Sequence, residues 1–161
     1  MNICEMKDNF LKEIENLHKR NEISKSAGAD YFEPGMMEYP EQSDGILDEE
    51  TGEFEISFEV KGTRYEGRTE QIEKIKTGDS VLLVREKENP YNSNNFRIYT
   101  CKNKDVGHVP AALCNAMAPL YDQEYMKIET AEVSYVEPIS IRSRYAKQAM
   151  LFVKVSGKIQ I

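Results

Sequence analysis

Residues 78–86 read Gly-Asp-Ser-Val-Leu-Leu-Val-Arg-Glu, and four apolar residues, Val81-Leu82-Leu83-Val84, stand at their centre. A short apolar run between a Gly-Asp turn and a charged pair is typical of a β-strand. Because no polar residue interrupts the run, we expect this strand to be buried on both faces. No apolar run in the chain approaches the roughly twenty residues that a membrane-spanning helix needs, so no membrane segment is expected.

Other strands are predicted on both sides of this run. Upstream, Phe54, Ile56, Phe58 and Val60 alternate with polar residues, as in a strand with one buried face. Pro110 suits the first position of a helix through Met117, which Pro119 would end or kink. A helical turn is predicted over 69–76, and further strands over 96–99, 106–109, 126–136 and 149–155. About five or six short strands with small helices predict a mainly β (α+β) fold, a small OB-like β-barrel.

Charge divides the chain into two parts. Residues 1–52 contain 5 basic and 13 acidic side chains, whereas residues 53–161 contain 16 basic and 15 acidic ones. The net charge of -7 therefore comes from an acidic N-terminal arm, and it excludes a uniformly basic protein that coats duplex DNA. We expect residues 1–52 to form a helix and linker, and residues 53–161 to form the barrel domain.

The first part of the arm has the periodicity of an amphipathic helix. Between Ile3 and Arg20, apolar residues recur at spacings of three and four, at Ile3, Met6, Phe10, Ile14 and Leu17. Such a helix can dock on its own domain, or it can dimerise or bind a partner. Residues 21–52 are rich in Pro, Gly and acidic residues and are expected to form a linker, with Met36–Tyr39 and Ile46-Leu47 as its only anchors.

The motifs of the common enzyme classes are missing from this sequence. It has no Gly-x-x-x-x-Gly-Lys-Ser/Thr phosphate loop and no Gly-x-Ser-x-Gly elbow. Cys4, Cys101 and Cys114 lack zinc-ligand spacing, and His18 and His108 are the only histidines. We therefore expect neither catalysis nor a metal or other cofactor. The first residues do not resemble a secretory signal, so a cytoplasmic protein is expected.

Four short blocks between residues 78 and 120 identify a family. After residues 78–86 come Asn89-Pro90-Tyr91-Asn92-Ser93-Asn94, then Val106-Gly107-His108-Val109-Pro110, and then Ala118-Pro119-Leu120. In order and spacing these blocks resemble the HIRAN domain, a small modified OB-like barrel found in free-standing bacterial and phage proteins and in eukaryotic fork-remodelling ATPases. The resemblance covers about residues 54–157 and leaves the acidic arm outside.

The resemblance implies a module that binds single-stranded DNA and grips its 3′ end. Matched position by position, the residues implied in nucleic-acid binding are Arg64, Tyr65, Asn89, Tyr91, Asn92 and His108. Two tyrosines can hold a terminal base by stacking, which is worth about 1–3 kcal/mol per base and does not read its identity. Cations for the phosphates are available at Arg64, Lys87, Lys102 or Lys104.

Each of these residues also has a purely structural interpretation. Tyr65 and Tyr91 can cap the barrel, Asn89 can bond its own backbone in the loop, and His108 can be an ordinary strand residue. Asn92 stands where the family usually has Asp, whose carboxylate accepts a hydrogen bond from a 3′ hydroxyl. An amide oxygen accepts without charge assistance, so Asn92 weakens the expectation of end specificity.

Two functions follow from these observations. The first is a nucleic-acid-binding module for single-stranded DNA or DNA 3′ ends. The alternative is a protein-interaction factor, such as a phage or mobile-element inhibitor of a nucleic-acid-handling enzyme, which binds its partner through residues 1–52 and uses the barrel as a scaffold.

Overall fold

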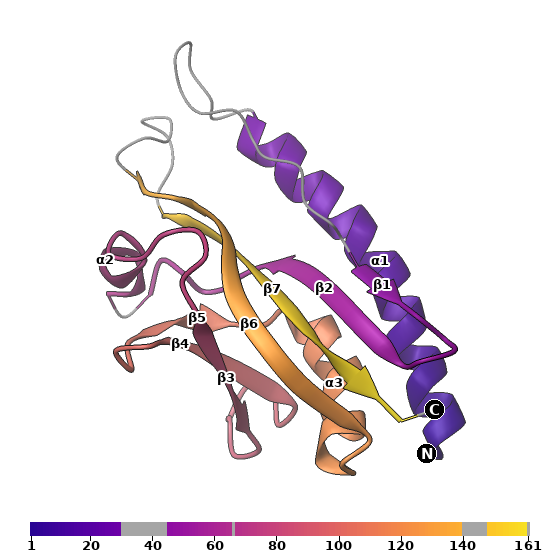
Figure 1. The fold of residues 1–161 in the computed structure, drawn as a ribbon. Coiled ribbons are helices and arrows are strands. Elements are labelled where there is room, and N and C mark those ends of the chain that lie inside the picture. Colours follow the sequence, from indigo (N-terminus) through magenta and orange to yellow (C-terminus); the bar gives the residue numbers. More distant parts are fainter. Residues whose placement is uncertain (30–44, 66, 140–147, 161) are drawn as a thin grey trace.

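The computed structural model describes residues 1–29, 45–65, 67–139 and 148–160, and the side chains of residues 18–29 lie outside the description. Seven strands and three helices are found in these ranges (Figure 1). In chain order they are α1 (Ile3–Ala29), β1 (Gly45–Leu47), β2 (Glu53–Glu59), α2 (Arg68–Ile72), β3 (Val81–Glu86), β4 (Asn95–Thr100), β5 (Asp105–His108), α3 (Ala111–Asp122), β6 (Met126–Glu137) and β7 (Met150–Ile159).

The strands form two antiparallel sheets. The larger has the order β1-β2-β7-β6, and the smaller has the order β3-β4-β5. Two isolated antiparallel bridges, Ser80 with Glu132 and Lys61 with His108, join the chain segments of one sheet to those of the other. The prediction of a mainly β fold with small helices is confirmed, and β1 is a strand that the sequence pattern did not indicate.

The buried face of β2 is the one that its alternation predicts. Phe54, Ile56 and Phe58 are buried, and so is Val60 just beyond the strand. The prediction for β3 is wrong, because Leu82 is 55% exposed and Val84 is 43% exposed. The reason is that β3 is an edge strand of the smaller antiparallel sheet, and such a sheet packs only one face on the core.

Helix α3 begins where the sequence indicates but continues further. Pro110 is its N-cap, and Leu113, Cys114 and Met117 on its inner face are buried. Pro119 does not end the helix, which runs on to Asp122. The carbonyl that loses its partner to Pro119 belongs to Asn115, an exposed residue, so water can replace the missing hydrogen bond.

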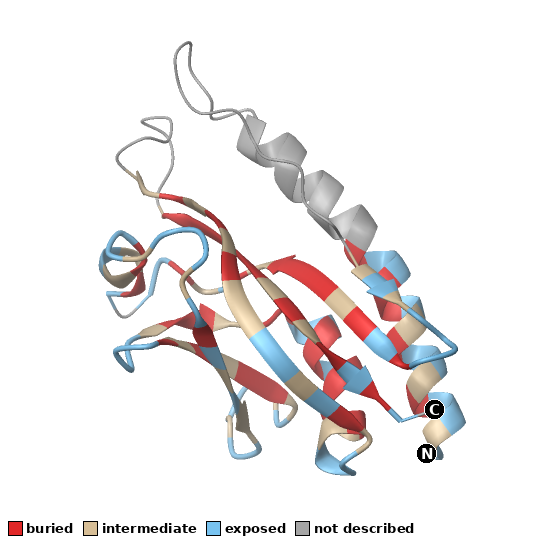
Figure 2. Ribbon diagram, in the orientation of Figure 1, coloured by how far each residue is buried: buried red, intermediate tan, exposed pale blue. Residues whose placement is uncertain are grey.

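Helix α1 is longer than predicted and packs on its own domain. It extends through Ala29, and Met6, Phe10, Ile14 and Leu17 are buried in the same core as the strands (Figure 2). The rings of Phe10 and Phe54 meet edge to face, with centroids 5.3 Å apart. The apolar stripe of the described half of α1 is therefore covered by the chain itself.

The segment after α1 is attached to the larger sheet near its end. Gly45–Leu47 pairs with β2, with Leu47 opposite Phe54, so Ile46-Leu47 does act as an anchor. The other expected anchor, Met36–Tyr39, lies outside the described residues. The division of the chain at residue 52 stays a prediction. Among the described residues, no helix is both long and apolar enough to cross a membrane.

We predict that Phe10→Ala destabilises the protein by about 3–5 kcal/mol, because a fully buried aromatic ring is lost and a cavity remains. Urea unfolding followed by circular dichroism measures this loss. Lys12→Ala, on the exposed face of the same helix, is the control and should change stability by less than about 0.5 kcal/mol. A loss below about 1 kcal/mol for Phe10→Ala would show that α1 is not part of the core.

Candidate functional site

A chain of alternating charges crosses the outer face of the smaller sheet. Glu86 on β3 accepts from Arg97 on β4 (Oε2 to Nε, 3.0 Å), and Arg97 donates to Asp105 on β5 (Nη1 to Oδ2, 2.7 Å). The same Asp105 oxygen accepts from Arg68 on α2 at 3.0 Å, and Arg68 also donates to the carbonyl of Gly62 at 2.9 Å. Two carboxylates and two guanidinium groups thus compensate one another from the β3–β4 loop to the loop before α2.

These contacts shift the pKa values of the charged groups. Burial raises the pKa of Glu86, but its hydrogen bonds lower it more, so that it lies below its ordinary value. Burial likewise raises the pKa of Asp105, and hydrogen bonds from Arg68, Arg97 and the Gly107 amide bring it below its ordinary value. The pKa of Arg97 is lowered by burial and raised more by its two carboxylate partners. Glu86, Asp105 and Arg97 are therefore charged at neutral pH.

The β3–β4 loop, residues 87–94, is fixed by hydrogen bonds at its base. The Asn89 side-chain oxygen accepts from the backbone amides of Tyr91 (2.9 Å) and Asn92 (3.0 Å), which closes an Asx turn. Its amide nitrogen donates to Glu86 at 3.2 Å, and Asn95 donates to the same carboxylate oxygen at 2.6 Å. The expected structural role of Asn89 is confirmed, and this turn leaves the Tyr91 side chain 96% exposed.

Arg85 attaches the same loop to α3. Its guanidinium forms a two-pronged pair with Asp122 at 3.0 and 2.9 Å and donates to the Ser93 carbonyl at 2.7 Å. It also lies over the Phe96 ring, 5.6 Å from the centroid. The guanidinium of Arg85 is thus hydrogen-bonded to groups of the protein itself, as expected for a charged residue next to Glu86 at the end of the strand.

The segment between β2 and α2 presents Arg64 and Tyr65. Tyr65 is 52% exposed, and Arg64 donates to its hydroxyl at 2.6 Å with the guanidinium carbon 4.8 Å from the ring centroid. Thr63 holds the segment from beneath, since its buried hydroxyl donates to the Ala149 carbonyl at 3.1 Å. Gly62 has φ +75°, and a Cβ there would lie 2.7 Å from the Arg68 guanidinium, so the turn requires glycine.

His108 ends β5 beside this segment. Its backbone exchanges two hydrogen bonds with Lys61, at 2.9 and 3.1 Å. Its Nδ1 lies 3.2 Å from the Val109 carbonyl, which can only accept, so in the neutral tautomer that satisfies this contact Nδ1 is the donor and Nε2 the acceptor. The preceding Gly107 permits this pairing, because a Cβ there would lie 2.4 Å from the Lys61 carbonyl. The half-buried imidazole is therefore oriented by the backbone of its neighbours.

The six residues singled out from the sequence lie on three segments. Arg64 and Tyr65 contact each other, Asn89, Tyr91 and Asn92 share one turn, and His108 is bonded to the strand end that leads to Arg64. Among the described residues, neither the Tyr65 nor the Tyr91 ring packs on another aromatic ring, and both are too exposed to cap the barrel. What joins the segments is the charge chain Glu86–Arg97–Asp105–Arg68, which sequence reasoning missed.

The residues do not suggest a metal centre. Among the described residues, no group of three or more His, Cys, Asp and Glu side chains is arranged to hold a metal ion. The polar groups of the site are instead hydrogen-bonded to one another and to the backbone, and its exposed elements are aromatic rings, an amide and one imidazole nitrogen.

The sheet order and these loops define a small antiparallel two-sheet β domain of the OB-like class. The chain belongs to the HIRAN domain family, whose sequence model matches residues 53–151. The crystal structure of the HIRAN domain of human HLTF is 20% identical, with 66% of this chain and 76% of that chain covered and a TM-score of 0.50. A crystal structure of a protein from Lactobacillus plantarum has the same identity and TM-score and covers 66% of this chain and 99% of that one.

A third solved structure, of the same human domain, is also similar to this chain. The NMR structure of the HLTF HIRAN domain in its DNA-bound conformation is 24% identical, covering 65% of this chain and 75% of that one, with a TM-score of 0.43. No curated protein matches the sequence.

We predict that Asp105→Asn destabilises the protein by about 2 kcal/mol at pH 7, because Arg68 and Arg97 lose a shared, partly buried carboxylate. The folded-state pKa of Asp105 lies below its unfolded value, so this stabilisation is complete above about pH 4 and is lost as pH falls through the folded value. Urea unfolding of both proteins between pH 7 and pH 2 measures it. A difference that stays constant down to the lowest pH would contradict the assignment.

Proposed function

We propose that this protein binds single-stranded DNA, preferentially at a 3′ end, and that Tyr91 and Tyr65 stack on its bases. The observation that carries the proposal is the exposure of Tyr91, whose ring stands almost wholly in solvent on a loop fixed by Asn89, Glu86 and Arg85. An exposed ring on a fixed loop loses little entropy when a base stacks on it.

Family membership supports DNA as the ligand. The HIRAN domain of human HLTF, from the same family, is known in a DNA-bound conformation. In this proposal the chain acts as a binding module in the cytoplasm, without a catalytic step and without a cofactor. The outer face of the smaller sheet carries compensated charges, so stacking rather than bulk charge supplies most of the affinity.

Arg64, Tyr65 and His108 have separate roles in the proposed complex. The Arg64 guanidinium holds the Tyr65 hydroxyl and keeps further N–H donors for a phosphate oxygen. His108 offers Nε2 as a neutral acceptor to a sugar hydroxyl or a base amino group. Arg64 and His108 are both positioned by the same strand pairing, because the Lys61–His108 bridge joins the end of β5 to the segment that follows β2.

Asn92 is the residue proposed to meet the terminal 3′ hydroxyl. Its side-chain oxygen already accepts from the Asn94 amide at 3.0 Å, and a carbonyl oxygen has a second lone pair for the hydroxyl. An aspartate here would attract the hydroxyl more strongly and would repel a terminal phosphate. The amide keeps about half of the attraction and lacks the repulsion.

We predict that Tyr91→Ala weakens binding of a fluorescent oligothymidine by about 1–3 kcal/mol while the fold is unchanged. Tyr91→Phe keeps the stacking surface and is the matched control, with affinity close to that of the wild type. Fluorescence anisotropy gives the affinities, and circular dichroism checks the fold. Unchanged affinity for Tyr91→Ala, or equal wild-type affinity for blunt duplex and single strand, would refute the proposal.

We further predict that the wild type distinguishes a 3′ hydroxyl from a 3′ phosphate by less than about 1 kcal/mol, and that Asn92→Asp increases this preference. Two oligonucleotides that differ only at this terminus, each titrated with both proteins, provide the test. A strong hydroxyl preference in the wild type would assign end recognition to another group. An unchanged preference in Asn92→Asp would place residue 92 outside the interface.

A further inference from the structure

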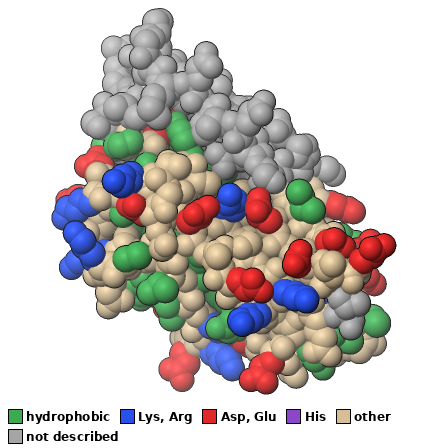
Figure 3. All heavy atoms as spheres, in the orientation of Figure 1, with side chains coloured by type: hydrophobic (Ala, Val, Ile, Leu, Met, Phe, Trp, Pro, Cys, Tyr) green, Lys and Arg blue, Asp and Glu red, His purple; other side chains and the backbone are tan. Residues whose placement is uncertain are grey.

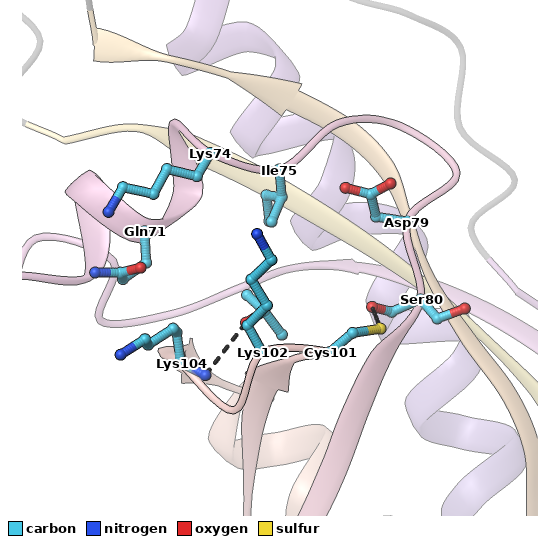
Figure 4. Close-up of a pocket in the computed structure, with 9 residues that line it drawn as sticks. Gln71, Lys74, Ile75, Asp79, Ser80, Cys101, Lys102 and Lys104 are labelled. Atoms are coloured by element: carbon cyan, nitrogen blue, oxygen red, sulfur yellow. Dashed lines mark hydrogen bonds between the residues drawn. The ribbon is translucent and has the colours of Figure 1, made fainter.

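A basic pocket lies at the opposite end of the smaller sheet from the β3–β4 loop. Its cavity of about 430 Å³ is lined by Gln71, Lys74, Ile75, Asp79, Ser80, Thr100, Cys101, Lys102 and Lys104 (Figure 4). Val81 pairs with Thr100 at this end and Glu86 pairs with Asn95 at the other, so five residues at about 3.3 Å each separate the two ends by about 17 Å. The pocket contains none of the six residues proposed to bind DNA, which are Arg64, Tyr65, Asn89, Tyr91, Asn92 and His108.

Three lysines from different parts of the sequence line this pocket. Lys74 follows α2, whereas Lys102 and Lys104 come from the β4–β5 turn, and none of them forms an ion pair with a carboxylate of the described residues. Figure 3 shows Lys and Arg side chains gathered at the left edge, the side on which Figure 1 places α2 and this turn. The sequence grouped Lys102 and Lys104 with the candidate interface, but the structure places them with Lys74.

The only acidic group in the lining is already engaged by the backbone. Asp79 accepts from the Lys76 amide at 3.0 Å through one carboxylate oxygen. The lining therefore has three ammonium groups and one carboxylate, an excess of two positive charges on a chain whose net charge is -7. A dianion would complement this excess and relieve the repulsion among the lysines.

The walls of the pocket are fixed by hydrogen bonds. The Thr100 hydroxyl accepts from the Lys104 amide at 3.2 Å, and the Thr100 amide donates to the Lys104 carbonyl at 2.9 Å, which closes the β4–β5 turn. On the other side, Asp79 accepts from the amide of Val133 on β6 at 2.8 Å through its backbone carbonyl. The backbones of Lys104 and Asp79 are thus held before any ligand arrives.

We propose that this pocket binds a nucleoside phosphate, either a free nucleotide or one unit of a nucleic-acid strand. The lysines take the phosphate group as point charges, which suit a dianion in several orientations. Ile75 offers an apolar surface to the base or sugar, while Gln71 and Ser80 offer polar groups, and the cavity volume lies within the range of small-molecule sites. This inference does not depend on the proposed binding of DNA by Tyr65 and Tyr91.

Cys101 allows ligand binding in the pocket to be measured. Its thiol is exposed, lines the cavity and donates to the Ser80 carbonyl at 3.1 Å. Of the other cysteines, Cys4 is exposed on α1, and Cys114 is buried with a pKa that burial raises to about 11. In a Cys4→Ser protein, the neutral reagent iodoacetamide therefore alkylates Cys101, and mass spectrometry follows the rate.

We expect dTMP to slow alkylation of Cys101 at a lower concentration than either thymidine or sodium sulfate at the same ionic strength, because each of these supplies only part of the contacts. Lys102→Glu/Lys104→Glu should raise the half-protecting dTMP concentration by about tenfold or more, since two charge-assisted contacts are lost. The control variant Lys127→Glu/Lys158→Glu changes a pair of exposed lysines on β6 and β7 and alters the net charge by the same amount. It should leave the half-protecting dTMP concentration unchanged.

The source of the nucleotide is resolved with an oligothymidine. Protection at a lower concentration of strand than of dTMP identifies a unit of a bound strand, and equal or better protection by dTMP identifies a free nucleotide. Protection by dTMP that survives Lys102→Glu/Lys104→Glu, equal protection by thymidine or sulfate, or no protection at all would overturn the proposal. Tyr91→Ala separates the two sites, because it should weaken tyrosine-dependent strand binding and leave dTMP protection intact.

Discussion

The Asp105 carboxylate, shared between Arg97 at 2.7 Å and Arg68 at 3.0 Å, joins parts of the molecule that are distant in sequence. Arg97 continues the contact to Glu86, which holds Asn89 and so the turn that displays Tyr91. Arg68 continues it to the Gly62 carbonyl, at the start of the turn that displays Tyr65. Both candidate binding loops are therefore linked to one aspartate through a continuous chain of contacts. Such a network is costly to break because each partner would leave an uncompensated charge.

The network is supported by a core in which α1 participates. Phe10 packs edge to face on Phe54 of β2, and β2 leads directly into the Gly62 turn. In the proposed complex, rigid loops on this core would keep the ordering cost of binding a single strand low. The described half of α1 and the near-neutral remainder thus form one packed unit.

The sequence predicted features that depend on local pattern. The alternation from Phe54 to Val60 indicated the buried face of β2, and the spacing of Met6, Phe10, Ile14 and Leu17 indicated the buried stripe of α1. The motif blocks indicated the family that the match over residues 53–151 shows. These signals are carried by residues close together in the chain, where periodicity and spacing suffice.

Features that depend on sheet order or strand register were not predictable in this way. Leu82 and Val84 look buried in the sequence, but β3 turned out to be an edge strand. Arg68, Arg97 and Asp105 are unremarkable as sequence positions and meet only because β4 pairs with β5 and α2 lies beside β5. Lys74, which is distant in sequence, likewise lines one pocket with Lys102 and Lys104 only in the folded chain. Pro119 does not end α3, because the carbonyl that it deprives of a partner belongs to the exposed Asn115.

If one carboxylate orders both tyrosine loops, neutralising Asp105 should loosen them together. The most direct measurement is backbone ¹⁵N relaxation of the wild type and Asp105→Asn, with order parameters for residues 62–65, residues 89–92 and, as a reference, β1 (Gly45–Leu47). Both loops should lose order together in the variant, from about 0.85 toward about 0.6, while β1 is unchanged. If either loop keeps its wild-type order, the two are held independently and the claim is wrong.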